Sequence, residues 1–145
     1  MSAKTTLIKA FFDTNVLVYQ FDKSAPLKQK QAKTLIKQAL QTGHGVISSQ
    51  VAQEFLNVAT SKFASKIPAL LLGNVLSDML LPLLALSPSA DFYERALGLF
   101  TTNKLSFYDA LIIQAAIDLK CDVLYSEDLQ TGRKFESVLI QNPFE

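Results

Sequence analysis

Short apolar segments alternate with longer amphipathic ones along most of this chain, and this alternation constrains the fold more than any other feature. The apolar segments at residues 7–12, 45–48, 83–86 and 122–125 have the length and the aromatic or aliphatic content of buried strands. Strands that alternate with helices form a parallel sheet that the helices cover. The sequence therefore predicts an α/β fold with three layers, in which helices flank a central, mostly parallel sheet.

The helices are predicted from apolar stripes that recur at helical spacing and from residues that start or stop helices. In chain order they cover residues 14–21, 27–41, 49–63, 68–81, 88–102 and 107–120. The helix at residues 107–120 is apolar nearly all round between residues 110 and 116, which indicates a central position. A last strand is predicted at residues 138–140, at an edge of the sheet.

The most apolar stretch, residues 67–86, has the length of a membrane span but not its composition. It contains Pro68, Gly73, Asp78 and Pro82, and an aspartate at mid-bilayer costs roughly 2.5 to 3.5 kcal/mol. We therefore expect a buried helix followed by a strand. The surplus leucines at residues 70–81 fit either a thick core or the interface of a homodimer.

Length and composition predict one globular domain in the cytoplasm. The chain has 145 residues, of which 49% are hydrophobic, enough for a single core that spans residues 1–145. Its one cysteine, Cys121, excludes an internal disulfide bond, as expected in a reducing compartment. The polar residues at positions 1–6 predict no secretion signal, and no membrane association is expected.

Four acidic residues lie where such a sheet would bring them together. Asp13 follows the first strand, Glu54 lies in the helix after the second, Asp109 opens a later helix and Asp128 follows the strand at residues 122–125. Ligands of parallel α/β sheets bind beyond the carboxyl ends of the strands. Carboxylates gathered there form a site for a hard cation.

Three of these acids also have an ordinary structural explanation. Ser106 and Asp109 fit a capping box at the start of a helix. Asp13 fits the cap of the helix that follows it, and Asp128 fits a turn. Glu54 is different, because it lies at the margin of an apolar stripe, where an ionised acid needs a partner or a metal.

Other kinds of site find little support. His44 is the only histidine, so it has no partner for a zinc site or a catalytic triad. Cys121 precedes a buried strand and is expected to be a core thiol. The five glycines are too scattered for a phosphate-binding loop or a dinucleotide fingerprint.

Taken together, the acidic motifs resemble those of PIN-domain ribonucleases, of the kind found as VapC-like toxins of bacterial toxin–antitoxin pairs. The resemblance covers the whole chain. It rests on Phe12-Asp13-Thr14-Asn15, on Glu54, on Ser106-Phe107-Tyr108-Asp109-Ala110 and on Tyr125-Ser126-Glu127-Asp128. It implies a catalytic, metal-binding cluster of Asp13, Glu54, Asp109 and Asp128, which the polar residues Asn15, Ser106 and Ser126 orient.

The resemblance implies an endoribonuclease that hydrolyses RNA phosphodiester bonds, a cognate antitoxin partner and a homodimer. Oxygen ligands without histidine or cysteine select Mg²⁺ or Mn²⁺ over zinc. Asp13 and Asp109 are expected to bind the ion directly, and Glu54 and Asp128 to bind through water or at a second metal position. Whether Glu127 contributes beside Asp128 stays open, as does the number of metals.

Three alternatives compete with the nuclease. One is a small receiver-like signalling domain, which is disfavoured because its acids would cluster at only two strand ends. A PIN-like fold can serve as a non-catalytic RNA-binding or assembly module, although all four acids are present here. A metal-dependent phosphatase also carries an aspartate after its first strand, but that chemistry needs a second aspartate two residues later, where this chain has Asn15. A magnesium titration on a structured RNA separates the nuclease from the binding module.

Overall fold

In the computed structural model, residues 7–61 and 67–145 are described, and their strands form one sheet in the order β3-β2-β1-β4-β6-β5. These strands are β1 (Ala10–Phe12), β2 (Gly45–Ser48), β3 (Leu84–Leu86), β4 (Val123–Tyr125), β5 (Lys134–Phe135) and β6 (Val138–Gln141). Neighbouring strands pair in parallel, except that β5 runs antiparallel to β6. The predicted mostly parallel sheet is confirmed.

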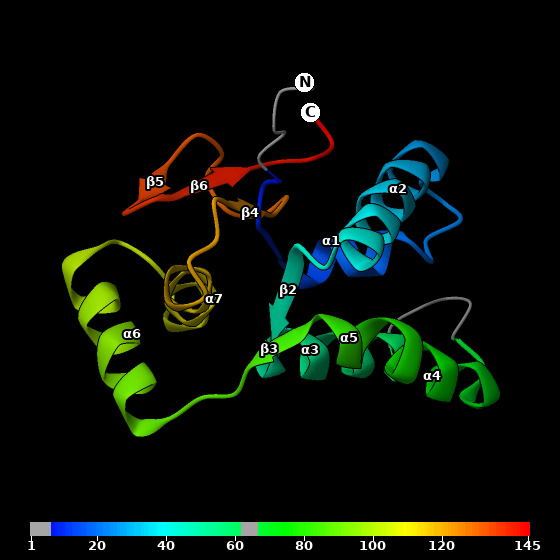
Figure 1. Cartoon of the computed structure of the whole chain (residues 1–145), viewed down its shortest axis with the longest axis horizontal. Coiled ribbons are helices and arrows are strands. Elements are labelled where there is room, and N and C mark those ends of the chain that lie inside the picture. Colours follow the sequence, from blue (N-terminus) through cyan, green and yellow to red (C-terminus); the bar gives the residue numbers. More distant parts are fainter. Residues whose placement is uncertain (1–6, 62–66) are drawn as a thin grey trace, which may run out of the picture.

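Helices connect the strands and cover both faces of the sheet (Figure 1). They are α1 (Thr14–Tyr19), α2 (Pro26–Thr42), α3 (Ser49–Ser61), α4 (Ala69–Val75), the π-helical turn η1 (Leu76–Leu80), α5 (Leu81–Leu83), α6 (Ala90–Thr102) and α7 (Phe107–Asp118). In Figure 1, α6 and α7 lie on one side of the sheet and α2 lies on the other. This arrangement is the expected α/β/α fold.

The core lies between the sheet and these helices. Phe11 and Phe12 of β1 are both buried, one on each face of the central strand. Gly45 opens β2 where α2 passes very close: a Cβ atom there would lie 2.4 Å from the Cβ of Ala39 and 2.8 Å from the ring of Phe12. A side chain at Gly45 would therefore push α2 away from the sheet.

The order of the strands creates a switch point beside β1. From β1 the chain adds β2 and β3 on one side, and later adds β4 and β6 on the other. The helix α1 follows β1 and a loop follows β4, and ligands of open α/β sheets bind beyond the carboxyl ends of the strands at such a switch point. Asp13 follows β1 and Ser126 follows β4, so both residues lie at this switch point.

Most predicted elements are found within one to three residues of their expected bounds. The strand predicted at residues 7–12 is shorter than expected, because β1 starts at Ala10 and both Leu7 and Ile8 are exposed. The helix predicted at residues 49–63 is α3, and its last two predicted residues lie outside the described part of the chain. Cys121 is a buried thiol, as expected, and burial raises its pKa to about 12.

The prediction of a buried helix at residues 68–81 was wrong. No residue of α4 is buried, and the side chains of Leu70, Leu71 and Leu81 are 88%, 49% and 53% exposed. In the segment from α4 through α5, here called the α4–α5 arm, the buried residues are Met79, Leu80 and Leu83. Leu72 and Val75 pack against the core but are only partly buried. Pro82 also lies inside α5 instead of ending the helix before it. Apolar content misled the prediction because it does not report whether a neighbour covers the helix.

The prediction that residues 138–140 form an edge strand was also wrong. β6 lies between β4 and β5, so β5 is the edge strand on that side. Glu136 joins β5 to β6 with φ of 53°, a left-handed conformation that closes a tight turn without glycine. A two-residue strand and a turn without the usual glycine give too weak a pattern to be recognised in sequence.

Candidate functional site

Asp13 occupies the switch point between β1 and β4. Its backbone N–H donates to the carbonyl of Tyr125 at 2.9 Å, which extends the pairing of the two strands by one residue. Its carboxylate caps α1 by accepting from the Thr14 N–H at 2.8 Å. The other carboxylate oxygen accepts from the Ser126 hydroxyl, also at 2.8 Å. The Asp13 carboxylate is therefore fixed from both strands.

The surroundings of Asp13 oppose its ionisation. Burial raises the pKa of this carboxyl to about 6, although hydrogen bonds from Ser126 and Thr14 act in the opposite direction. The negative charges of Glu54 and Asp128 raise it further. An aspartate in this position holds an uncompensated negative charge near neutral pH, which is the electrostatic condition that favours a bound cation.

Glu54 reaches the switch point from α3. It is partly buried, and its Oε2 accepts from the Thr14 hydroxyl at 3.3 Å. Its other oxygen accepts from the Gln50 side-chain amide at 2.7 Å, one helical turn earlier. Thr14 thus touches Glu54 through its hydroxyl and Asp13 through its amide, so a single residue links the two acids.

The loop after β4 brings in Asp128. The Ser126 side chain is fully buried, and its oxygen accepts from the backbone N–H groups of Asp128 and Leu129, both at 3.2 Å, while it donates to Asp13. Asn15 then spans this loop: its amide donates to the Asp128 carboxylate at 3.1 Å, and its carbonyl oxygen accepts from the Glu127 N–H at 3.2 Å. Asp128 itself is exposed.

Glu127 points to different partners from its neighbour Asp128. The Tyr19 hydroxyl donates to its Oε1 at 2.6 Å, and Lys28 forms an ion pair with its Oε2. Burial raises the pKa of Glu127, but the hydrogen bonds from Lys28 and Tyr19 outweigh burial and leave the pKa below its usual value. The charge of Glu127 is therefore already compensated by Lys28, whereas no lysine or arginine pairs with Asp128 in the described residues.

Ser106 and Asp109 open α7, as the sequence predicts. The Ser106 side chain accepts from the Asp109 N–H at 3.1 Å, which is one half of the expected capping box. Asp109 is partly buried. Within residues 7–61 and 67–145, no hydrogen bond connects the Asp109 carboxylate with Asp13, Glu54 or Asp128.

Hydrogen bonds thus connect three of the acids in one network, and Asp109 is not part of that network. Thr14, Ser126 and Asn15 join Asp13, Glu54 and Asp128 by hydrogen bonds. In the described part of the chain, no three His, Cys, Asp or Glu side chains converge closely enough to form a ready-made metal cage. Mg²⁺ does not require such a cage, because it keeps several water ligands and binds through one or two carboxylates together with substrate phosphates.

Four residues of this network escaped the sequence analysis: Thr14, Tyr19, Lys28 and Gln50. The signal for Gln50 was available, because an amide four residues before an acid on one helix is placed to bond to it. Thr14 lies inside the motif Phe12-Asp13-Thr14-Asn15, but that motif does not indicate that its hydroxyl contacts Glu54 on α3. Lys28 and Tyr19 meet Glu127 across about a hundred residues of sequence, and nothing local indicates that contact.

An open α/β sheet with carboxylates at its switch point defines a class of proteins that bind ligands beyond the carboxyl ends of their strands. The family model for the PIN domain matches residues 10–134, and the chain belongs to the PIN domain family. Members of this family are generally nucleases. No curated protein matches the chain at a significant level.

Several solved structures share this fold. A chain of a toxin–antitoxin complex from Klebsiella pneumoniae is 24% identical, with a TM-score of 0.63 over 94% of this chain and 98% of that one. A chain of VapBC2 from Rickettsia felis, bound to a promoter DNA fragment, is 18% identical with a TM-score of 0.61 over 92% and 97%. A chain of FitAcB from Neisseria gonorrhoeae is 17% identical with a TM-score of 0.59 over 93% and 98%. These similarities support the fold.

Within the described residues, no helix is both long and apolar enough to cross a membrane.

Proposed function

We propose that this protein is a metal-dependent endoribonuclease that acts in the cytoplasm as the toxin of a type II toxin–antitoxin pair. The observation that carries the proposal is Asp13, a partly buried carboxylate fixed at the switch point by Ser126, with a pKa of about 6. Membership of the PIN domain family and the fold shared with toxin–antitoxin complexes support the same function.

The donor set fits Mg²⁺ or Mn²⁺. Every candidate ligand is a carboxylate oxygen, which hard cations prefer to nitrogen or sulfur. We assign Asp13 and Asp109 as direct ligands, and Glu54 and Asp128 as residues that bind through water or complete a second position. When bound, the ion supplies the charge stabilisation that phosphodiester hydrolysis requires.

The chain's own residues hold the carboxylates in place for this role. Ser126 and the Thr14 amide each bond one oxygen of Asp13, so this carboxylate cannot rotate freely. Asn15 holds Asp128 and Thr14 holds Glu54. Fixed ligands of this kind reduce the reorganisation needed when substrate and cation bind.

An RNA substrate follows from the resemblance to PIN-domain toxins and from the chemistry of the site. Phosphate groups complete the coordination of a cation that few carboxylates hold. The charge balance is compatible with a polyanion, because the nine acids outside the candidate cluster face fourteen Lys and Arg residues.

The exposed leucines of the α4–α5 arm support the proposed protein partners. Leu70, Leu71 and Leu81 are 88%, 49% and 53% exposed, and large exposed apolar side chains of this kind are typical of contacts with other proteins. We propose a homodimer and a cognate antitoxin that blocks the acidic site. Analytical ultracentrifugation of the isolated chain tests the first claim, and a strict monomer at micromolar concentration would remove it.

Cleavage of a structured RNA by the Asp13→Asn variant tests the enzymatic claim. We expect cleavage by the native chain with Mg²⁺ or Mn²⁺, and loss of about a hundredfold or more in the variant, because several kcal/mol of charge stabilisation depend on the bound ion. Asp78→Asn is a matched control, since Asp78 is an exposed acid on η1. Magnesium-dependent cleavage by Asp13→Asn at the native rate would contradict the assignment.

A native chain that binds the RNA with Mg²⁺ present but never cuts it would instead favour the non-catalytic binding module. Release of inorganic phosphate from phosphomonoesters, without internal cuts in RNA, would favour a phosphatase.

A further inference from the structure

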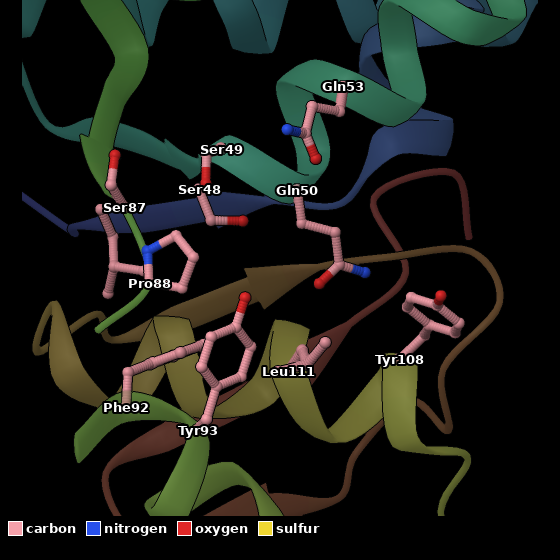
Figure 2. A pocket seen from close by; sticks show the side chains of 11 residues that line it. Ser48, Ser49, Gln50, Gln53, Ser87, Pro88, Phe92, Tyr93, Tyr108 and Leu111 are labelled. Carbon is pink, nitrogen blue, oxygen red and sulfur yellow. The ribbon is translucent and has the colours of Figure 1, made fainter. Parts of the chain in front are cut away.

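A second feature of the carboxyl edge is a pocket beyond the ends of β2 and β3, beside the acidic site. It has a volume of about 350 Å³ and lies between the start of α3, the segment after β3, and helices α6 and α7 (Figure 2). Its size is in the range of small-ligand sites. None of the side chains that line it carries a charge, so the pocket suits a neutral group better than a phosphate.

Ser48, the last residue of β2, has a buried hydroxyl without a hydrogen-bond partner in the described part of the chain, and this group favours a bound ligand. Its side chain is only 4% exposed, and its hydroxyl has no hydrogen-bond partner among the described residues. Figure 2 shows this hydroxyl directed into the pocket. Buried polar groups are nearly always bonded, so a ligand that offers a donor or an acceptor at this point is favoured.

Two tyrosines and the side-chain amide of Gln50 also line the pocket. Tyr93 of α6 and Tyr108 of α7 are 47% and 69% exposed, with their rings on the pocket side in Figure 2. Aromatic faces of this kind stack against nucleic-acid bases. Gln50 extends its amide into the same space, and an amide supplies the paired donor and acceptor that base edges recognise.

Contacts join this pocket to the acidic site. The Gln50 amide donates to Glu54 at 2.7 Å, and Glu54 in turn accepts from Thr14 beside Asp13. On the opposite wall, Tyr108 immediately precedes Asp109 in sequence. A nucleotide whose phosphate lies at the carboxylates therefore has this pocket within reach of its base.

We infer that the pocket binds one unpaired base of the RNA substrate, next to the phosphate that is cut. The inference rests on the proposed nuclease function, because that function puts the phosphate at the acids. Stacking on Tyr93 and Tyr108 provides affinity for any base. Hydrogen bonds to Ser48 and Gln50 discriminate among bases, so the pocket gives the enzyme a base preference beside the cleavage site.

Binding of short single-stranded homopolymers of U, C, A and G tests the pocket directly. Fluorescence anisotropy is measured with Mg²⁺ in the Asp13→Asn background, so that the RNA stays intact. Adding Tyr93→Ala should weaken binding about tenfold or more, the usual cost of one lost stacking partner. Ser48→Ala should change the ratio of affinities among the four homopolymers.

Two control variants accompany this experiment. Phe100→Ala removes another exposed aromatic ring of α6 that does not line the pocket, and it should leave binding unchanged. Tyr93→Phe keeps the ring and should retain most of the affinity, which assigns the binding to the ring and not to the hydroxyl. Equal binding by the Tyr93→Ala variant and its parent, with unchanged affinity ratios in Ser48→Ala, would overturn the inference.

Cleavage maps separate this inference from the proposed function. If the native chain cuts RNA, and Ser48→Ala changes the base next to the cut, both proposals stand. If the native chain cuts RNA but Tyr93→Ala and Ser48→Ala alter neither binding nor cut sites, the pocket assignment fails alone. If the native chain never cuts RNA but Tyr93→Ala weakens homopolymer binding, the nuclease fails and the pocket is a base-binding site with no cut beside it.

Discussion

The acidic switch point and the α4–α5 arm depart from the usual distribution of side chains in opposite directions. At the switch point, polar and charged groups such as Asp13 and Ser126 are buried or partly buried. On the arm, Leu70, Leu71 and Leu81 face outward. Neither arrangement lowers the free energy of the isolated fold, because burying charge and exposing apolar surface both cost stability.

The two regions differ in what completes them. Under the proposed function, the acids bind a cation and a polyanion, which are small or flexible. The leucines would pack against the broad apolar surface of the proposed protein partners. Residues that oppose stability in one chain alone thus indicate two kinds of binding partner, and substitutions at each should separate function from folding.

Substitutions within the arm should give the largest contrast in stability. Leu80 is completely buried whereas Leu70 is 88% exposed. We expect Leu80→Ala to lower the free energy of unfolding by about 2 to 5 kcal/mol, and Leu70→Ala to change it by less than about 0.5 kcal/mol. Urea denaturation at concentrations where the chain is monomeric measures both. Similar losses in the two variants would mean that the outer leucines already have a covering partner within the monomer.

The contrast also explains what could be predicted from sequence. Most strands and helices follow from local patterns of apolar residues, and so Asp13 and Asp128 were expected at the carboxyl edge of the sheet. The order of the strands, and with it the switch point, depends on how distant segments pair. The exposure of the arm was not predictable, because a leucine-rich helix has the same pattern whether it is covered or not. The pairing of Glu127 with Lys28 depends on how two distant segments pack, which no local pattern records.

Ionisation of the buried Asp13 carboxyl should lower the stability of the fold. Because its pKa in the fold is about 6, above the ordinary 3.8, Asp13 favours the folded state most when protonated, and this advantage is lost as the pH rises through 6. Asp13→Asn cannot ionise and should be more stable than the native chain by about 1 to 3 kcal/mol at pH 7 without metal. Below pH 4 the two should be equal.

Unfolding by urea at pH 4 and pH 7, with a chelator present, measures this difference. Asp78→Asn, which removes an exposed acid on the arm, should show no such dependence on pH. If the native chain is as stable as Asp13→Asn at pH 7, burial does not destabilise the ionised Asp13 carboxylate. The case for a cation at this position would then be weaker.

Ser126 positions the Asp13 carboxylate, and its loss should weaken metal binding. Ser126→Ala removes the hydroxyl that donates to Asp13 and accepts from the Asp128 and Leu129 amides. We expect the affinity for Mn²⁺ to fall by about 10- to 100-fold, as is typical when a group that orients a metal ligand is lost. Titration of Mn²⁺ by calorimetry measures it, and Ser137→Ala, on the exposed turn before β6, is the control. Unchanged affinity would mean that Ser126 serves the fold alone.

The smallest effects are expected where one acid already has its partner. Lys28 compensates Glu127 at a partly solvated ion pair, and such pairs often contribute nothing measurable to stability. Lys28→Met should therefore leave both the unfolding curve and the magnesium dependence of cleavage nearly unchanged, whereas Asp128→Asn should weaken the magnesium response. If Lys28→Met instead lowers the magnesium concentration that cleavage requires, the freed Glu127 carboxylate has joined the site, and the division of roles between these adjacent acids depends on Lys28.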